Sequence, residues 1–275
     1  MAFSLFAPAK VNLALHVLGR RADGYHELDS IVGFADIGDR LDFSPSDAFA
    51  ITAEGRFAAA LPPPGENIIA GAWKAAGRIA SARGTLLPPV SVHLVKNLPL
   101  ASGIGGGSAN AAAALRGFLR LAGITGLDPE IMAEGLALGA DVPVCLAGRA
   151  CRMRGVGERI TPLEGFGPLK AILVNPLVEV STAAVFRQLA LAPGQGLGEA
   201  IRDERDPSGW RNDLAAAAAA IAPVIGEVLE RLVSAPGVKR AFMSGSGATC
   251  VALYEGEAPA PRLEPGWWSA RAVIR

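Results

Sequence analysis

The sequence predicts a protein that contains both strands and helices. Apolar residues alternate with polar or small residues at 6–17 and 90–94, which is typical of strands. An alanine-rich helical run begins directly behind a glycine-rich loop at 103–107. A strand, a glycine turn and a second strand follow at 239–254. With 275 residues, the chain forms one large domain or two modest ones.

The composition argues against two classes of protein. Lys+Arg and Asp+Glu each number 26, and this zero net charge argues against non-specific nucleic-acid binding. The hydrophobic content of 51% reflects the many alanines. No uninterrupted apolar run approaches the ~18 residues that span a bilayer, which argues against a membrane-spanning protein. No signal peptide is recognised. Three cysteines without metal-type spacing predict reduced, buried thiols, so we expect a cytoplasmic protein.

The first strand, at 6–17, places two polar residues side by side. Lys10 and Asn12 share one face with Ala14 and His16, and the larger apolar residues lie on the other face. One interpretation is a solvated polar face. The other is a ligand site, because the small neighbours leave room beside Lys10 and Asn12.

The segment after this strand predicts a turn at 19–26, then a strand, a turn at 36–39 and a strand that ends at Phe43. Tyr25 and His26 follow the turn, where a side chain can stack on a flat ligand. For His26, the alternative is a structural or surface histidine. Asn67 then leads a helix over 70–83.

The glycine loop at 103–107 predicts a phosphate site. A glycine loop that opens a helix directs unpaired N–H groups and the positive end of the helix dipole at one point. The P-loop pattern fails because no Lys precedes Ser108, and the dinucleotide pattern fails because Ser108 replaces its third glycine. We therefore predict a nucleotide triphosphate site of another type. The alternative is a flexible surface loop.

A helix predicted at 128–139 precedes an isolated acid, Asp141. This residue lies between small and apolar neighbours and before a Val-Pro pair. It is either a turn-former or a catalytic base.

The second half of the chain predicts a strand at 171–174 and a helix at 183–191, capped by Ser181-Thr182. The four-residue spacing places Thr182 and Phe186 on one helical face. The glycine turn at 244–247 is either a plain hairpin or a second phosphate-contacting loop.

Three motifs together resemble those of the GHMP small-molecule kinases: Pro-Ala-Lys-Val-Asn at 8–12, the loop at 99–110 and Ser-Gly-Ser-Gly at 244–247. Arg-Ala-Asp-Gly-Tyr-His at 21–26 and Gly-Ala-Asp-Val-Pro at 139–143 resemble the branch of that superfamily that acts on a cytidine diphosphate-linked methylerythritol.

This resemblance implies a GHMP kinase-like two-domain fold of the α+β class, with the active site in the interdomain cleft. The N-terminal GHMP kinase ATP-binding domain would span 1–158, and the C-terminal α+β domain 159–275. The implied reaction is ATP-dependent phosphorylation of the 2-hydroxyl of the methylerythritol unit, in non-mevalonate (MEP) isoprenoid precursor biosynthesis. ATP is the implied co-substrate, and Mg²⁺ is expected with it, held through the phosphates and waters, with Ser108 as a candidate contact and no other protein ligand assigned. We expect no nucleic-acid or membrane partner, and a monomer or homodimer.

The resemblance also implies roles for individual residues. Asp141 corresponds to the base that takes the hydroxyl proton, Lys10 to its charge-stabilising partner, and Asn12 lies beside the reacting group. Asn67 and Lys96 are candidates for the adenine end. The residues that correspond to the cytidine-binding end are Tyr25, His26, Thr182 and Phe186. The residues that correspond to the ATP phosphate loop are Pro99, Leu100, Ala101, Ser102, Gly103, Ile104, Gly105, Gly106, Gly107, Ser108 and Ala109.

Three alternatives remain. The first is another GHMP small-molecule kinase, of the homoserine or mevalonate type, although Tyr25, His26 and Phe186 suit a flat cytosine better than an aliphatic acceptor. The second is a non-catalytic nucleotide-binding module, against which Lys10 and Asp141 argue. The third is a dinucleotide oxidoreductase, which the failed glycine pattern disfavours.

Overall fold

The structure is a computed structural model that describes residues 2–275 and divides the chain into two compact units. Unit 1 comprises the chain up to Ala9, together with Gly38–Leu100 and Gly105–Gly148. Unit 2 comprises Lys10–Ile37, Ala101–Ile104 and Arg149–Arg275. Neither unit is continuous in sequence, because the chain changes unit within two long strands and within the glycine loop. The boundary between the N-terminal domain at 1–158 and the C-terminal domain at 159–275 stays a prediction.

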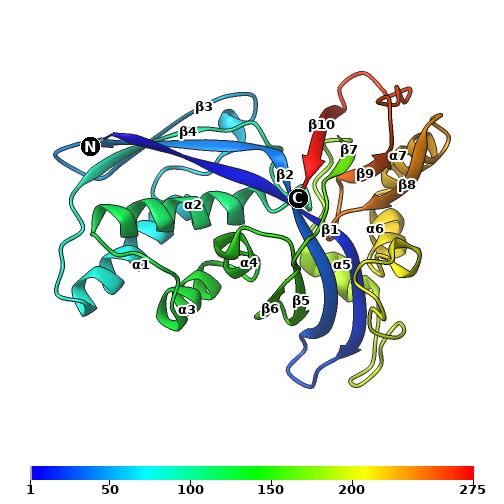
Figure 1. The fold of residues 1–275 in the computed structure, drawn as a ribbon, viewed down its shortest axis with the longest axis horizontal. Coiled ribbons are helices and arrows are strands. Elements are labelled where there is room, and N and C mark those ends of the chain that lie inside the picture. The colour runs from blue at the N-terminus through cyan, green and yellow to red at the C-terminus, as the bar shows by residue number, and fades with distance from the viewer. Residues whose placement is uncertain (1) are drawn as a thin grey trace. The chain divides into compact units, whose positions relative to one another are not determined.

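Unit 1 is a sheet with helices on one side. Strand β4 (Val90–Val95) pairs in parallel with β3 (Ala50–Glu54) and antiparallel with the second half of β2 (His26–Pro45). Strand β1 (Phe3–Arg20) also pairs with β2. The helices α1, α2, α3 and α4 lie on one side of β3 and β4 (Figure 1). These helices span Ile68–Ala82, Gly106–Leu121, Pro129–Leu138 and Val142–Ala147, and a short 3₁₀ helix spans Ala58–Ala60.

Aromatic residues fill the space between the sheet and α2 in unit 1. Phe43 from β2 meets Phe118 from α2 edge-on, with ring centroids 5.6 Å apart. Gly117 lets this ring approach the helix, because a Cβ at that position would lie 2.2 Å from the Cζ atom of Phe43. The C-terminal half of helix α2 is therefore seated closely on the sheet.

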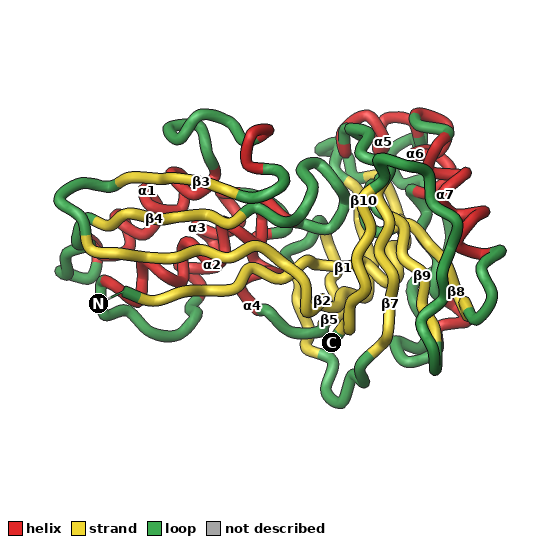
Figure 2. The backbone as a smooth tube through the Cα atoms, turned by 90° about the horizontal axis from the view of Figure 1, so that it is seen from above, coloured by secondary structure: helices red, strands yellow, loops and turns green. Residues whose placement is uncertain are grey.

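Unit 2 contains the remaining strands. Strand β10 (Trp268–Ile274) pairs antiparallel with β7 (Leu169–Asn175), and one residue pair joins β10 to the first half of β2. Strand β9 (Cys250–Tyr254) lies between β7 and β8 (Val238–Met243), as Figure 2 shows. Strand β5 (Cys151–Gly155) pairs with β2 and with β6 (Arg159–Pro162). The helices of this unit are α5 (Thr182–Gln188), α6 (Ala215–Ile221), α7 (Val224–Val233) and a 3₁₀ helix (Pro207–Gly209).

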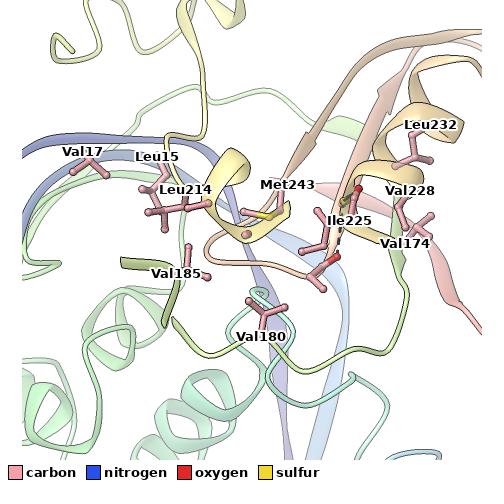
Figure 3. Packing of buried hydrophobic residues seen from close by; sticks show 14 of the residues in the cluster. Leu15, Val17, Val174, Val180, Val185, Leu214, Ile225, Val228, Leu232 and Met243 are labelled. Atoms are coloured by element: carbon pink, nitrogen blue, oxygen red, sulfur yellow. Dashed lines mark hydrogen bonds between the residues drawn. The ribbon is translucent and has the colours of Figure 1, made fainter. Parts of the chain in front are cut away.

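The core of unit 2 gathers buried side chains from β1, α5, α7 and β8, among them Leu15, Val185, Ile225 and Met243 (Figure 3). Met243 ends β8 immediately before the glycine turn at 244–247. Packing of this core therefore fixes the position at which that turn leaves the sheet.

Most predicted elements are confirmed, but the turn at 36–39 is wrong. Strand β2 continues without a break through this segment. Asp39, which suggested a turn, is fully buried and accepts the N–H groups of Asn97 and Leu98 at 2.7 and 2.9 Å. Gly38 passes close to Ala7, whose carbonyl oxygen would lie 2.3 Å from an added Cβ. Contacts distant in sequence thus override the local turn preference of Asp and Gly.

Helix α4 is a further difference from the sequence prediction, which did not extend a helix beyond Gly139. Its Pro143 is tolerated because the first turn of a helix needs no N–H at that position. Within residues 2–275, no helix combines the length and the apolar character needed to cross a membrane.

Candidate active site

The first half of the glycine loop interlocks with the second glycine turn inside unit 2. Gly103 has φ +73°, and an added Cβ would lie 2.4 Å from the carbonyl oxygen of Ser244 and 2.7 Å from that of Gly247. Gly245 has φ +57°, and its Cβ would lie 2.8 Å from the carbonyl oxygen of Gly103. Both positions therefore require glycine, because of the backbone angle and because of the close approach.

Hydrogen bonds join this pair of turns to β1. The Ser244 hydroxyl accepts the N–H of Asn12 at 3.0 Å and donates to the carbonyl of Gly103 at 2.9 Å. The N–H of Lys10 donates to the carbonyl of Ile104 at 3.0 Å, and the N–H of Thr249 donates to that of Ser102 at 3.0 Å. The three sequence motifs therefore meet within one unit, and the 244–247 turn is more than a plain hairpin.

The second half of the loop begins helix α2 in unit 1. Gly105 adopts the left-handed conformation at the N-cap, with φ +63°, and its carbonyl accepts the N–H of Ala109 at 2.7 Å. The N–H groups of 106–108 therefore lie in the first helical turn, where no helical carbonyl is available to them. Gly107 is exposed, and an added Cβ would meet nothing within 4 Å. This geometry suits an anion at the positive end of the helix dipole.

Lys96 lies beneath this helix start and is fully buried. Its Nζ atom donates to Asp39 at 2.5 Å and to the carbonyl of Leu98 at 2.7 Å. Burial lowers the pKa of the Lys96 ammonium, and the charge and hydrogen bond of Asp39 oppose this shift. A Cβ on Gly106 would lie 3.3 Å from the same Nζ atom. Lys96 therefore braces the strand-to-loop segment.

Asn67 accepts the N–H of Ile69 at 3.0 Å and caps α1. This cap accounts structurally for one of the two residues predicted at the adenine end. Lys96, the other, is engaged with Asp39. Contact of Asn67 and Lys96 with adenine stays a prediction.

Lys10 and Asn12 point along one face of β1, as the alternation predicted. Both are buried, with 3% and 1% of their surface exposed, so the interpretation of a solvated face is wrong. The Lys10 Nζ atom donates to Asn12 Oδ1 at 2.8 Å, and Asn12 Nδ2 donates to the Ser30 hydroxyl at 2.8 Å. A buried ammonium with a fixed amide partner is suited to neutralising phosphate charge.

Asp141 occupies the N-cap position of α4 in unit 1 and is half-buried. Its backbone is in the right-handed helical region, and its side chain makes no capping hydrogen bond to the helix. The carboxylate is therefore not used to begin α4, in contrast to Asp128, which caps α3 by accepting the N–H of Ile131 at 3.0 Å. A base role for Asp141 stays a prediction.

The residues predicted at the cytidine end come together in unit 2. The rings of His26 and Phe186 are stacked, with centroids 4.8 Å apart and planes 28° apart. The hydroxyl of Thr182 is hydrogen-bonded to that of Ser246 at 2.7 Å. Tyr25, which precedes His26 in the sequence, is 63% exposed. Burial, and then the positive charge of Arg20, lower the pKa of His26.

Two polar residues at this site were not predicted as functional. Ser30 completes the hydrogen-bond chain of Asn12. Asn212 accepts the N–H of Leu214 at 2.9 Å ahead of α6, and its amide also donates to the carbonyls of Met243 and Gly245 at 2.7 and 2.8 Å. It thereby holds the second glycine turn. The one sequence signal was the polar run at 211–213 before an alanine helix.

Comparisons with known proteins agree with this arrangement. Residues 67–149 match the GHMP kinases N terminal domain, and residues 194–270 match the GHMP kinases C terminal domain. A 4-diphosphocytidyl-2-C-methyl-D-erythritol kinase from Dinoroseobacter shibae is 46% identical over 284 residues, which cover 98% of this chain and 94% of the relative. The chain is a GHMP kinase.

This GHMP kinase is also similar to a second relative and to solved structures. A protein of the same name from Paramagnetospirillum magneticum is 45% identical over 286 residues, covering 99% of this chain and 98% of the relative. A crystal structure of 4-(cytidine 5'-diphospho)-2C-methyl-D-erythritol kinase has a TM-score of 0.78 at 30% identity, with 99% of both chains covered. The homoserine kinase of Cytophaga hutchinsonii has a TM-score of 0.63 at 16% identity, covering 100% of this chain and 94% of that one, and shares the fold.

Proposed function

We propose that this GHMP kinase transfers the γ-phosphoryl group of ATP to the 2-hydroxyl of 4-diphosphocytidyl-2-C-methyl-D-erythritol. Relatives with this kinase name are 46% and 45% identical over nearly the whole chain, which supports the substrate. The reaction belongs to non-mevalonate (MEP) isoprenoid precursor biosynthesis.

The observation that carries the proposal is the double attachment of the 244–247 turn. Its first serine, Ser244, bonds to the strand of Asn12 and to the phosphate loop at Gly103. Its second serine, Ser246, bonds to Thr182 at the start of α5, the helix that bears Phe186. One turn thus connects the residues assigned to phosphate, to the reacting centre and to cytidine. This connection suits a kinase that must bring a triphosphate and a cytidine-linked acceptor together.

The chemistry asks chiefly for positioning and charge neutralisation, because the transition state of phosphoryl transfer is loose. The N–H groups at the start of α2 and the ammonium of Lys10 supply positive charge to the phosphates. Asp141 accepts the proton of the acceptor hydroxyl as the new O–P bond forms. The transferred group leaves ADP behind.

Mg²⁺ accompanies ATP in this proposal. The first turn of α2 offers the half-buried hydroxyl of Ser108 beside its N–H groups, and oxygen donors are the ligands that Mg²⁺ prefers. When bound, the ion neutralises charge on the phosphate oxygens. Ser108 is the residue that would contact it, and triphosphate oxygens and waters would complete its coordination.

The aromatic pair of His26 and Phe186, together with the exposed Tyr25, binds the cytosine ring by stacking. An aliphatic acceptor such as homoserine or mevalonate has no flat group for these rings. We place the enzyme in the cytoplasm, in line with three buried cysteines that form no disulfide within residues 2–275. We retain a monomer or homodimer as its proposed assembly.

ADP release in a coupled assay tests the function. The full chain is given ATP and Mg²⁺ with the cytidine-linked methylerythritol, with homoserine or with mevalonate. We expect turnover with the first substrate and none above background with the other two. Absence of turnover with the first would refute the assignment, and turnover with homoserine or mevalonate alone would favour the corresponding kinase type.

A further inference from the structure

A chain of three hydrogen bonds runs through the interior of unit 2 and ends at Lys10. The Lys10 Nζ atom donates to Asn12 Oδ1 at 2.8 Å, Asn12 Nδ2 donates to the Ser30 hydroxyl at 2.8 Å, and that hydroxyl donates to the carbonyl of Ala14 at 2.6 Å. Lys10, Asn12 and Ser30 are 3%, 1% and 0% exposed. Water therefore does not compete for these groups.

The direction of every bond in this chain follows from its two ends. The carbonyl of Ala14 can only accept, so the single proton of Ser30 is used there and the hydroxyl oxygen faces Asn12 as an acceptor. The Asn12 amide must then present its NH₂ group to Ser30 and its oxygen to Lys10. The ammonium of Lys10 can only donate, which agrees with this orientation. Bonds that run in one direction also polarise and strengthen one another.

Rotating the amide of Asn12 by half a turn would break the chain at both ends. The NH₂ group would face the Lys10 ammonium, donor against donor, and the amide oxygen would face the lone pairs of Ser30. Gly245 borders the amide oxygen, because a Cβ there would lie 3.4 Å from Asn12 Oδ1. The hydroxyl of Ser30 and the ammonium of Lys10 therefore hold the Asn12 amide in this orientation from its two ends.

We infer that Ser30 is a positioning residue for phosphoryl transfer: through the Asn12 amide it holds the Lys10 ammonium in its working position. This inference rests on the proposed role of Lys10 in the kinase reaction. Ser30 itself touches neither ATP nor acceptor in this scheme. Its contribution is to the transition state, where the placement of positive charge matters most.

The test compares Ser30→Ala with Ser30→Thr, which retains a hydroxyl. We expect Ser30→Ala to lower kcat about tenfold and to change the KM values for ATP and acceptor less than about twofold, because transition-state stabilisation is what is lost. Ser30→Thr should recover most of the lost kcat. Ser234→Ala is the matched control, since its hydroxyl also donates to a backbone carbonyl, at 2.7 Å, but at the end of α7. Its kcat should equal that of the wild type.

A second measurement tests the hydrogen-bond chain independently of turnover. In the wild-type background, Ser30→Ala leaves the Asn12 NH₂ group buried without its acceptor, so Tm should fall. In an Asn12→Leu background no amide is present, and the same change should lower Tm much less. Equal Tm shifts in the two backgrounds would overturn the inference.

The outcomes separate the inference from the proposed function. A wild-type chain that does not turn over the cytidine substrate refutes the function, and the Tm comparison then decides the hydrogen-bond chain by itself. If the wild type is active, unchanged kcat in Ser30→Ala overturns the positioning role. Equal loss of kcat in a folded Ser30→Thr variant also overturns it, because the hydroxyl would not be the operative group.

Discussion

The hydroxyl of Ser244 donates to the carbonyl of Gly103 at 2.9 Å and so ties together two glycine turns that are 141 residues apart in sequence. At Gly103 this contact is so close that the carbonyl oxygen of Ser244 would lie 2.4 Å from an added Cβ. The phosphate loop of this GHMP kinase is therefore shaped by a partner turn as well as by its own glycines.

Replacement of Gly103 by alanine should disrupt the interlock. The new Cβ would collide with two carbonyl oxygens at a backbone φ of +73°, so we expect the free energy of unfolding to fall by about 1–3 kcal/mol. The KM for ATP should rise. Gly77→Ala is the control, because Gly77 lies within α1 with no atom within 4 Å of an added Cβ, and alanine there should stabilise by about 0.5–1 kcal/mol. Urea unfolding compares the two. Equal stability of both variants would contradict the interlock.

Removal of the proposed base should affect turnover more than folding. Asp141→Ala should lower kcat by about 10²–10⁴-fold while ATP still binds, because the proton acceptor is lost. The start of α4 should be retained, since this side chain makes no capping bond to that helix.

Asp128→Ala provides the opposite case at another helix start. This carboxylate caps α3, so its loss should lower Tm and leave kcat per folded molecule unchanged. Steady-state kinetics and thermal unfolding of the two variants measure both effects. Near-wild-type kcat in Asp141→Ala would rule out its role as the base.

The cytidine site is best probed at its exposed residue. Tyr25 is 63% exposed, so Tyr25→Ala should leave the fold intact, raise the KM for the cytidine substrate about 5–10-fold and leave the KM for ATP unchanged. Phe6→Ala is a matched control, because Phe6 is also an exposed aromatic residue, at 52%, and has no proposed role in binding. An unchanged KM for the acceptor in Tyr25→Ala would count against stacking on cytosine.

The stability of the protein should depend on the protonation of His26. Its pKa in the folded chain is below the ordinary value of 6.5, first because of burial and then because of Arg20. The unfolded chain therefore binds the proton at a higher pH than the folded chain. The free energy of unfolding should decrease as the pH falls from about 6.5 through the folded-state pKa. Above about 6.5, His26 is neutral in both states and its stabilising contribution is fully present.

His26→Gln should reduce this pH dependence, because the side chain no longer titrates. Urea unfolding of both proteins between pH 8 and pH 5 measures the difference, in a range set by the ordinary histidine pKa. Identical pH profiles for wild type and variant would show that His26 is not the source.

The local parts of the site were predictable because their signals are local. Period-two alternation placed Lys10 and Asn12 on one face of β1, and the glycines before an alanine run located the start of α2. The spacing of Thr182 and Phe186 on α5 was likewise a matter of helical period.

The errors and omissions have one physical cause, which is that the deciding partner is distant in the chain. Asp39 carries the residue type of a turn, yet it is held inside β2 by backbone groups 58 and 59 residues away. Ser30 is an ordinary strand residue until Asn12 is placed beside it. Asn212 accepts the N–H of Leu214 within its own segment, but its amide also holds Gly245 in a turn 33 residues further along. Local patterns do not contain these partners.

The sequence by itself determined where most strands and helices form, the strand face that carries Lys10 and Asn12, and the glycine loop that precedes the alanine-rich helix, because short-range sterics and backbone hydrogen bonding set these features. Only the tertiary structure decided that Gly103 and Ser244 interlock and that the amide of Asn12 faces Lys10 with its oxygen. Those outcomes depend on which buried donor meets which buried acceptor. That matching is settled only when segments far apart in the chain pack together.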